Sequence, residues 1–204
     1  MKFKKTTLIT IILVIVAIGV SGLALYIKKT TPITPHDIVR GMISATSYTT
    51  DVTYVVKNAR GQFKEDGKIE YISGENTKIT VSDKEQIFME DKIVIKYFKD
   101  NKIFNVSKDF DSFYKYMFIN ELPKFLEYEN NVSYSWETIG GRECLMIEYL
   151  LLSGNDNFYK EVFVIDKKNK VPLNAVIYDN KGNERITVEY KNFIKAKSNK
   201  KIFD

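Results

Sequence analysis

Hydrophobic residues run without a charge from Leu8 to Ile27, and lysines lie on both sides of the run. A helix rises about 1.5 Å per residue, so about 20 apolar residues cross a bilayer core of about 30 Å. The pattern therefore predicts a transmembrane anchor within residues 1–29. More lysines precede the run than follow it, which favours an inside amino terminus and an extracytoplasmic domain.

The same run has a second interpretation as a signal peptide. Its small residues Ser21, Gly22 and Ala24 would permit cleavage. Its length and its ending at Lys28 favour retention, because a signal peptide usually has a shorter apolar core. The only cysteine is Cys144, so no lipid-modified cysteine can follow the segment.

After the run, residues 30–34 form a short spacer rich in threonine and proline. Thr34 is a suitable helix cap, Pro35 suits the first helical position, and Asp37 is an acid in the first turn. Ile38, Val39, Met42 and Ile43 would give this helix one apolar face.

From residue 47 the apolar period changes to two, with β-branched and aromatic runs separated by Gly, Asn and Asp. The predicted strands cover 48–56, 68–72, 78–81, 86–89, 93–98, 103–106, 132–138, 143–150, 159–166, 171–178 and 184–193. We expect a mainly β domain over residues 35–195. It should be an antiparallel meander, with about two helices packed against the sheet.

The second predicted helix separates the two groups of strands and covers residues 109–122, ending or kinking at Pro123. Its apolar residues fall at helical spacing on one face: Phe110, Phe113, Tyr114, Met117 and Phe118. This stripe has two interpretations. It either plugs the concave face of the sheet, which we favour, or lines a hydrophobic groove for an acyl chain or a partner protein.

The charge balance argues against a nucleic-acid partner. Of 31 Lys and Arg, five flank the apolar run, so 26 basic residues face 26 acidic ones in the rest of the chain. The tail, 196–204, is locally basic and is expected to be a solvated terminus.

Catalytic candidates are few, and we expect no enzyme, no cofactor and no metal site. His36 is the only histidine and Cys144 the only cysteine, so a catalytic triad or a zinc site lacks residues. Asp109 and Asp111 lie at an expected helix start, where acids offset the helix dipole. The interpretation that remains is a binding protein.

The carboxy-terminal strands carry a family resemblance. A strand ending at Asp166, a Lys-rich turn, Pro172-Leu173, a second strand, a glycine turn and a third strand ending at Phe193 resemble the LolA-like lipoprotein-carrier superfamily. The resemblance implies a half-open antiparallel barrel closed by helices.

Within that superfamily, residues 47–52, 56–58, 106–111 and 178–185 are similar to the GerS-type germination lipoproteins of clostridia. This resemblance implies a non-catalytic, forespore-associated protein that binds a cortex amidase and supports cortex modification and germination. Those lipoproteins carry a lipidated cysteine, where this chain has a hydrophobic segment. The alternative is a lipid or lipoprotein carrier or sensor that holds an acyl chain on its concave face.

Overall fold

The computed structural model describes residues 13–14, 16–21, 32–45, 47–74, 76–110 and 112–196. The chain divides into two compact units, Met1–Thr34 and Pro35–Asp204. Most of the predicted anchor, Leu8 to Ile27, and residues 197–204 of the predicted tail lie outside the described residues. Residues 13–14 and 16–21 are helical. Among the helices described, none has both the length and the apolar character needed to cross a membrane.

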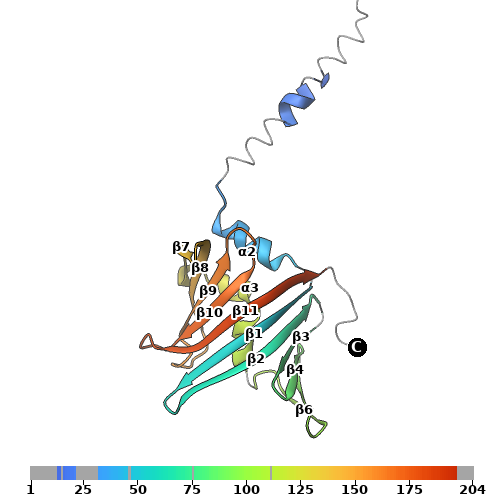
Figure 1. Ribbon diagram of the computed structural model, residues 1–204, viewed down its shortest axis with the longest axis vertical. Helices are drawn as coiled ribbons and strands as arrows, with labels where there is room; N and C mark the ends of the chain where they lie inside the picture. Colours follow the sequence, from blue (N-terminus) through green and yellow to red (C-terminus); the bar gives the residue numbers. More distant parts are fainter. Residues whose placement is uncertain are drawn as a thin grey trace, which may run out of the picture. The chain divides into compact units, whose positions relative to one another are not determined.

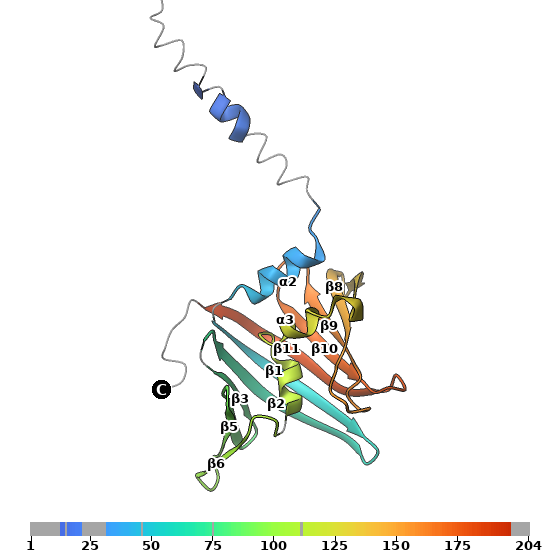
Figure 2. The same cartoon turned by 180° about the vertical axis from the view of Figure 1, so that it is seen from behind.

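The second unit is built on one open antiparallel sheet of eleven strands, and the predicted mainly β architecture is confirmed (Figures 1 and 2). The strands are β1 (Ser47–Asn58), β2 (Gly61–Ile72), β3 (Thr77–Val81), β4 (Lys84–Phe88), β5 (Lys92–Tyr97), β6 (Lys102–Ser107), β7 (Val132–Ile139), β8 (Arg142–Leu150), β9 (Lys160–Asp166), β10 (Pro172–Tyr178) and β11 (Glu184–Ala196). Their order is β6-β5-β4-β3-β2-β1-β11-β10-β9-β8-β7. The sheet thus consists of two meanders joined where β1 pairs with β11, and β6 and β7 form its edges.

Local features bend this sheet. The β1–β11 ladder shifts register between Thr49 and Asp51, and such a bulge increases the twist of a strand. Gly67 of β2 lies so close to β3 that a Cβ atom there would be 2.7 Å from the Thr80 carbonyl oxygen. The missing side chain therefore lets the two strands approach at this point.

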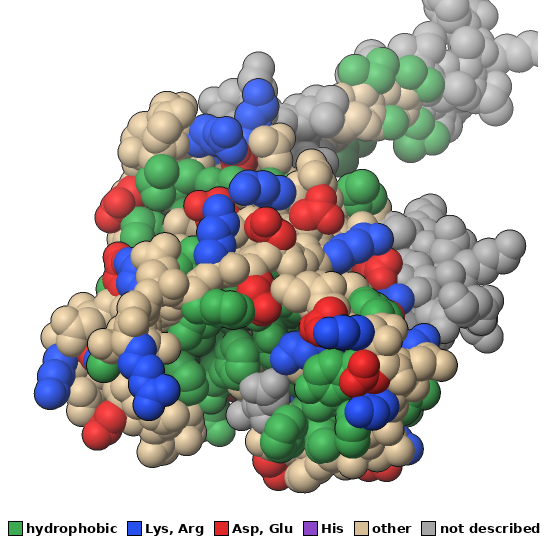
Figure 3. Space-filling model, turned by 60° about the horizontal axis from the view of Figure 1, so that its bottom comes forward, with side chains coloured by type: hydrophobic (Ala, Val, Ile, Leu, Met, Phe, Trp, Pro, Cys, Tyr) green, Lys and Arg blue, Asp and Glu red, His purple; other side chains and the backbone are tan. Residues whose placement is uncertain are grey.

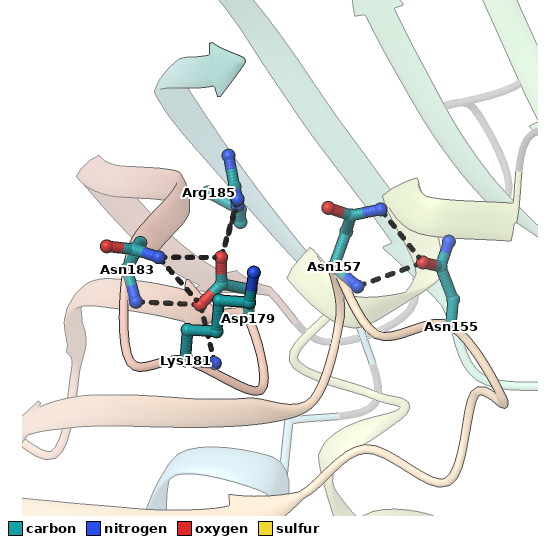
Figure 4. A network of polar contacts seen from close by, with 6 residues as sticks. All are labelled: Asn155, Asn157, Asp179, Lys181, Asn183 and Arg185. Atoms are coloured by element: carbon teal, nitrogen blue, oxygen red, sulfur yellow. Dashed lines mark hydrogen bonds and ion pairs between the residues drawn. The ribbon is translucent and has the colours of Figure 1, made fainter. Parts of the chain in front are cut away.

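The turn between β10 and β11 is fixed by Asp179, a buried residue (Figure 4). Its Oδ1 atom accepts the backbone N–H groups of Lys181 at 2.9 Å and Asn183 at 2.8 Å. Its Oδ2 atom accepts the Arg185 Nε–H group at 2.9 Å. Hydrogen bonds from Asn183 hold the pKa of Asp179 below its usual range, and Arg185 adds to the effect.

The first predicted helix is confirmed as α2 (Pro35–Ile43), and Ile38, Val39 and Met42 are buried on its inner side. The second is wrong in type. Residues 109–122 contain a 3-10 helix, η1 (Ser112–Met117), followed by turns, and the α-helix α3 covers Leu122–Leu126. Pro123 lies in the first turn of α3 instead of ending a helix. The backbone N–H groups of a first helical turn have no partner within the helix, so the N–H that proline lacks is not missed there. A short 3-10 turn, η2 (Glu129–Asn131), leads into β7.

The hydrophobic core of the described residues joins side chains of the sheet to side chains of the helices. Figure 2 shows the helices lying against the concave face of the sheet. Strand residues such as Val52, Ile79, Ile147 and Phe163 contribute to it, together with side chains of α2, η1 and α3. Residues 110–126 are called the inner segment. Because this segment covers part of the concave face, it determines how much of that face remains accessible.

Candidate functional site on the concave face

The inner segment is fastened to the sheet by tyrosine hydroxyl groups. The three contacts join Tyr48 to Asn120 Oδ1 at 2.7 Å, Tyr54 to the Tyr114 hydroxyl at 2.8 Å, and Tyr190 to the Met117 carbonyl oxygen at 2.7 Å. All three tyrosines belong to the central strands β1 and β11. Hydrogen bonds to buried polar groups fix geometry because leaving such groups unpaired is costly. The segment is therefore oriented at its centre by the sheet that it covers.

The five aromatic and methionine positions expected to act together are divided by the structure. Tyr114, Met117 and Phe118 are buried in the core, with at most 2% of their surface exposed. Phe113 is half-buried, and its ring lies 4.1 Å from that of Tyr114. Phe110 precedes η1 and is 52% exposed. Three of the positions thus pack inward as a plug would, and Phe110 lies at the surface.

Glu161 is an ionisable residue inside this core, and no pattern in the sequence marked it as a candidate site residue. It lies on β9 opposite Tyr149 of β8, its exposed fraction is 0%, and neither carboxyl oxygen has a hydrogen-bond partner among the described residues. Burial raises the pKa of Glu161 to about 8, and the nearby Tyr149 hydroxyl opposes the effect. At neutral pH the group is therefore mostly a neutral acid.

Aromatic rings gather around Tyr149, the residue opposite Glu161 on β8. Phe125 of α3 stacks on Tyr149 at 5.6 Å, and Tyr116 of η1 contacts Phe125 at 5.7 Å and Phe158 at 6.1 Å. Three tyrosines lie close enough to Glu161 for its charge to raise their pKa values: Tyr116, Tyr149 and Tyr190. This arrangement favours the neutral acid over the carboxylate.

Beside the inner segment, part of the concave face is open. A hollow of about 400 Å³ lies over β5 and β6 and is lined by Ile95, Tyr97, Asp100, Lys102, Phe104, Val106 and Phe110. Phe104 is 47% exposed, and the Asp100–Lys102 ion pair, at 3.2 Å, belongs to its polar rim. Figure 3 brings the bottom of the molecule forward, and hydrophobic side chains gather there with charged side chains around them. An exposed apolar hollow with a polar rim has the anatomy of a binding surface.

Sequence reasoning missed most of this hollow. Only Phe110 was a candidate, whereas Tyr97 and Phe104 passed as ordinary strand residues. A signal was present: Ile103 and Phe104 are neighbours in β6, so both faces of that strand carry a large apolar side chain. A strand that is apolar on both faces and yet lies at a sheet edge is unusual unless something covers it.

The remaining candidates of the sequence occupy structural positions. His36 is exposed at the start of α2, and Cys144 is fully buried on β8. Asp109 is exposed after β6, and Asp111 lies outside the described residues. In the part of the chain that the structure describes, no group of three His, Cys, Asp or Glu residues is placed to hold a metal ion.

The domain is thus one curved antiparallel sheet with short helices against its concave face. A family model described as sporulation protein YdcC-like matches residues 4–203. The chain therefore belongs to the YdcC-like family of sporulation proteins.

Solved structures are similar to this chain at low sequence identity. An uncharacterized conserved protein from Thermus thermophilus matches with 10% identity and a TM-score of 0.53, over 81% of this chain and 87% of that chain. A structure of the CwlD amidase from Clostridioides difficile in complex with the GerS lipoprotein matches with 20% identity and a TM-score of 0.44, over 81% and 98%. A LolA superfamily protein from Nitrosomonas europaea matches with 10% identity and a TM-score of 0.42, over 85% and 98%. No match is found among curated protein sequences.

Proposed function

We propose that this protein is a membrane-tethered, non-catalytic binding protein that acts outside the cytoplasm during sporulation, with a cell-wall amidase as its partner. Membership of a sporulation family supports the process. The resemblance of residues 47–52 and 178–185 to GerS-type lipoproteins supports the kind of partner. The tether is the apolar run Leu8 to Ile27.

The observation that carries a binding role is the open hollow over β5 and β6. Its apolar floor is continuous with the core through Ile95, which is 4% exposed, whereas Phe104 and Phe110 are about half exposed. Burying two such rings against a partner is favourable by about 1.5–3 kcal/mol each.

The alternative function, a lipid carrier, needs the same concave face as a container. The middle of that face is filled by Tyr114, Met117 and Phe118, which supports the plug interpretation of the inner segment. The hollow at its side is large enough for part of an acyl chain, since ligand pockets begin at about 300 Å³. The two functions therefore compete for one surface and can be separated by one set of variants.

The test uses the full chain, purified, and the purified cell-wall amidase of the same sporulating bacterium. We expect direct binding that falls at least tenfold in Phe104→Ser and in Phe110→Ser. Leu152→Ser is the matched control, because Leu152 is 65% exposed in a loop away from the hollow. Equal binding by all three variants would refute docking at the hollow. A bound acyl lipid seen by native mass spectrometry, together with no amidase binding, would establish the carrier instead.

A further inference from the structure

The strand at one edge of the sheet, β7, is long and regular. In the sheet that the structure describes, β7 ends the strand order and pairs with β8 alone (Figure 1). All eight of its residues pair with β8 without a register shift, and all of them except Val132 are exposed. The outer side of an edge strand presents a row of backbone N–H and C=O groups, with which another strand can pair.

The sequence of β7 does little to protect this edge. Proteins commonly protect a sheet edge with a bulge, with a proline or lysine in the strand, or by making the strand very short. Residues 132–139 contain neither proline nor lysine, and Glu137 is their only charged residue. The strand at the other edge, β6, is shorter and begins with Lys102. Of the two edges, β7 is therefore the better suited to accept a further strand.

The concave side of β7 carries two aromatic rings that are only partly covered. Tyr134 lies opposite Ile147 of β8, and Trp136 lies opposite Leu145. Both of these β8 residues are fully buried in the core, whereas the two rings are each 42% exposed. The core thus extends across the sheet as far as β7 and ends there. A strand added beside β7 would bury the rings further, because directly opposed side chains contact each other across a strand pair.

A second hollow adjoins these rings. It has a volume of about 330 Å³, and its apolar walls include Ile43 of α2, Leu126 of α3 and Tyr134 of β7. A strand directs every second side chain to the same face of a sheet. An added strand would therefore place alternate side chains on the concave side, next to Tyr134 and this hollow. The hollow suits an apolar side chain at such a position.

The convex side of β7 adds a charge preference. Glu137 is exposed on this side and lies opposite Cys144, which is fully buried. The residue of an added strand that faces Glu137 would have its Cβ about 5 Å away. Opposite charges at such a distance favour pairing and like charges oppose it, so a basic residue suits this position.

We propose that β7 binds an extended segment of a partner protein by strand addition, with apolar residues toward the hollow and a basic residue opposite Glu137. In this kind of recognition the backbone hydrogen bonds supply affinity and the alternate side chains supply specificity. The surface lies at the opposite edge of the sheet from the hollow over β5 and β6. The inference therefore does not rest on the proposed amidase partner.

The test uses the full chain in detergent micelles and a synthetic peptide as long as β7. The peptide alternates valine and threonine, with a lysine at the position that faces Glu137 in an antiparallel pair. Trp136 is the only tryptophan, so its emission reports binding directly. We expect a saturable shift to shorter wavelengths, because the peptide covers a ring that is 42% exposed.

Two methylated peptides test whether the backbone makes the contact. One is N-methylated at the residues whose N–H groups face β7, and the other at the alternate residues. The first should bind at least about tenfold more weakly than the second, because it cannot donate hydrogen bonds to the strand. Equal binding by the two would overturn strand addition.

Variants of the chain test the position of the peptide. Glu137→Lys should weaken binding several-fold and should favour a peptide with glutamate in place of its lysine. Glu189→Lys is the matched control, because Glu189 is an exposed acid of β11 that is paired with Lys191 at 3.2 Å. It should leave the binding of both peptides unchanged, as should Phe104→Ser in the other hollow. Binding that is lost in Phe104→Ser and kept in Glu137→Lys would overturn the assignment to β7.

Sedimentation of the chain separates the remaining outcomes. A monomeric chain whose Trp136 emission does not respond to the peptide would overturn the inference. A chain that is a dimer by itself and does not respond to the peptide would also overturn it, since a second copy would then occupy the edge. A chain that binds the peptide at β7 but does not bind the amidase would support this inference and refute the proposed function.

Discussion

Replacing Glu161 with glutamine should remove most of the pH dependence of the domain's stability between pH 4.5 and 8. The carboxyl group has a reference pKa of 4.5, whereas burial raises it to about 8 in the folded domain. Between those values the folded state keeps a proton that the unfolded state has lost. Stability therefore falls as the pH rises through this window. Below pH 4.5 both states are protonated, and the effect disappears.

The size of the effect follows from the same two values. Each pKa unit corresponds to about 1.4 kcal/mol, so the difference between 4.5 and about 8 sets an upper limit of about 5 kcal/mol. Local opening that admits water reduces the cost of a buried charge. We therefore expect the wild-type domain to lose about 2–5 kcal/mol between the two ends of the window. The glutamine variant has the same shape and no titration.

The assay is urea unfolding at a series of pH values, followed by the fluorescence of Trp136, the only tryptophan. Glu148→Gln is the matched control, because Glu148 is a neighbour on β8 that is exposed and paired with Lys160. Its pH profile should follow the wild type. Parallel profiles for Glu161→Gln and wild type would refute the reasoning, since the pH dependence would then come from other groups.

Three further changes test the packing. Phe118→Ala should lower the free energy of unfolding, measured in urea, by about 3–5 kcal/mol. Phe118 is 2% exposed, and its ring contacts that of Phe88 edge-to-face at 5.0 Å. A decrease of at most about 0.5 kcal/mol, as is usual at surface positions, would contradict its role in a plug. Gly67→Ala should cost about 1–3 kcal/mol and lower the melting temperature, since its new Cβ meets the backbone of β3. Asp179→Asn should lower the urea midpoint at pH 7, because the depressed pKa of Asp179 stabilises the folded state there. This stabilisation is lost as the pH falls below 3.8, so the difference from wild type should shrink. A difference that stays constant with pH would contradict the Asp179–Arg185 ion pair.

The strands could be predicted because each carries its own apolar period and ends at turn residues. The exception was β2, whose first half, from Gly61 to Gly67, is polar and mostly exposed. Its β structure comes from pairing with β1 and not from its own side chains. The 3-10 geometry of η1 is also a tertiary result, since Phe110–Phe118 fits an α-helical stripe equally well in the sequence.

The candidate site was less accessible to sequence reasoning. The pattern of β9 places Glu161 on the same face as Phe163 and Ile165, but a glutamate at a strand end ordinarily indicates solvent. Its neighbours come from segments far away in the chain: Tyr116 is close enough for the charge of Glu161 to raise its pKa, and Phe125 stacks on Tyr149 opposite Glu161.

The pairing of the first strand with the last has a consequence for how this domain folds. Each meander consists of neighbouring hairpins that can form early, but their seam brings together residues as distant as Val52 and Tyr190. Closing so long a loop is slow, because its entropy is lost before any contact is gained. Until β11 has been synthesised, β1 and β10 both remain open edges that can pair with other chains. The newly made protein is thus most prone to aggregation in the interval before its last strand arrives, and the seam is the step that ends it.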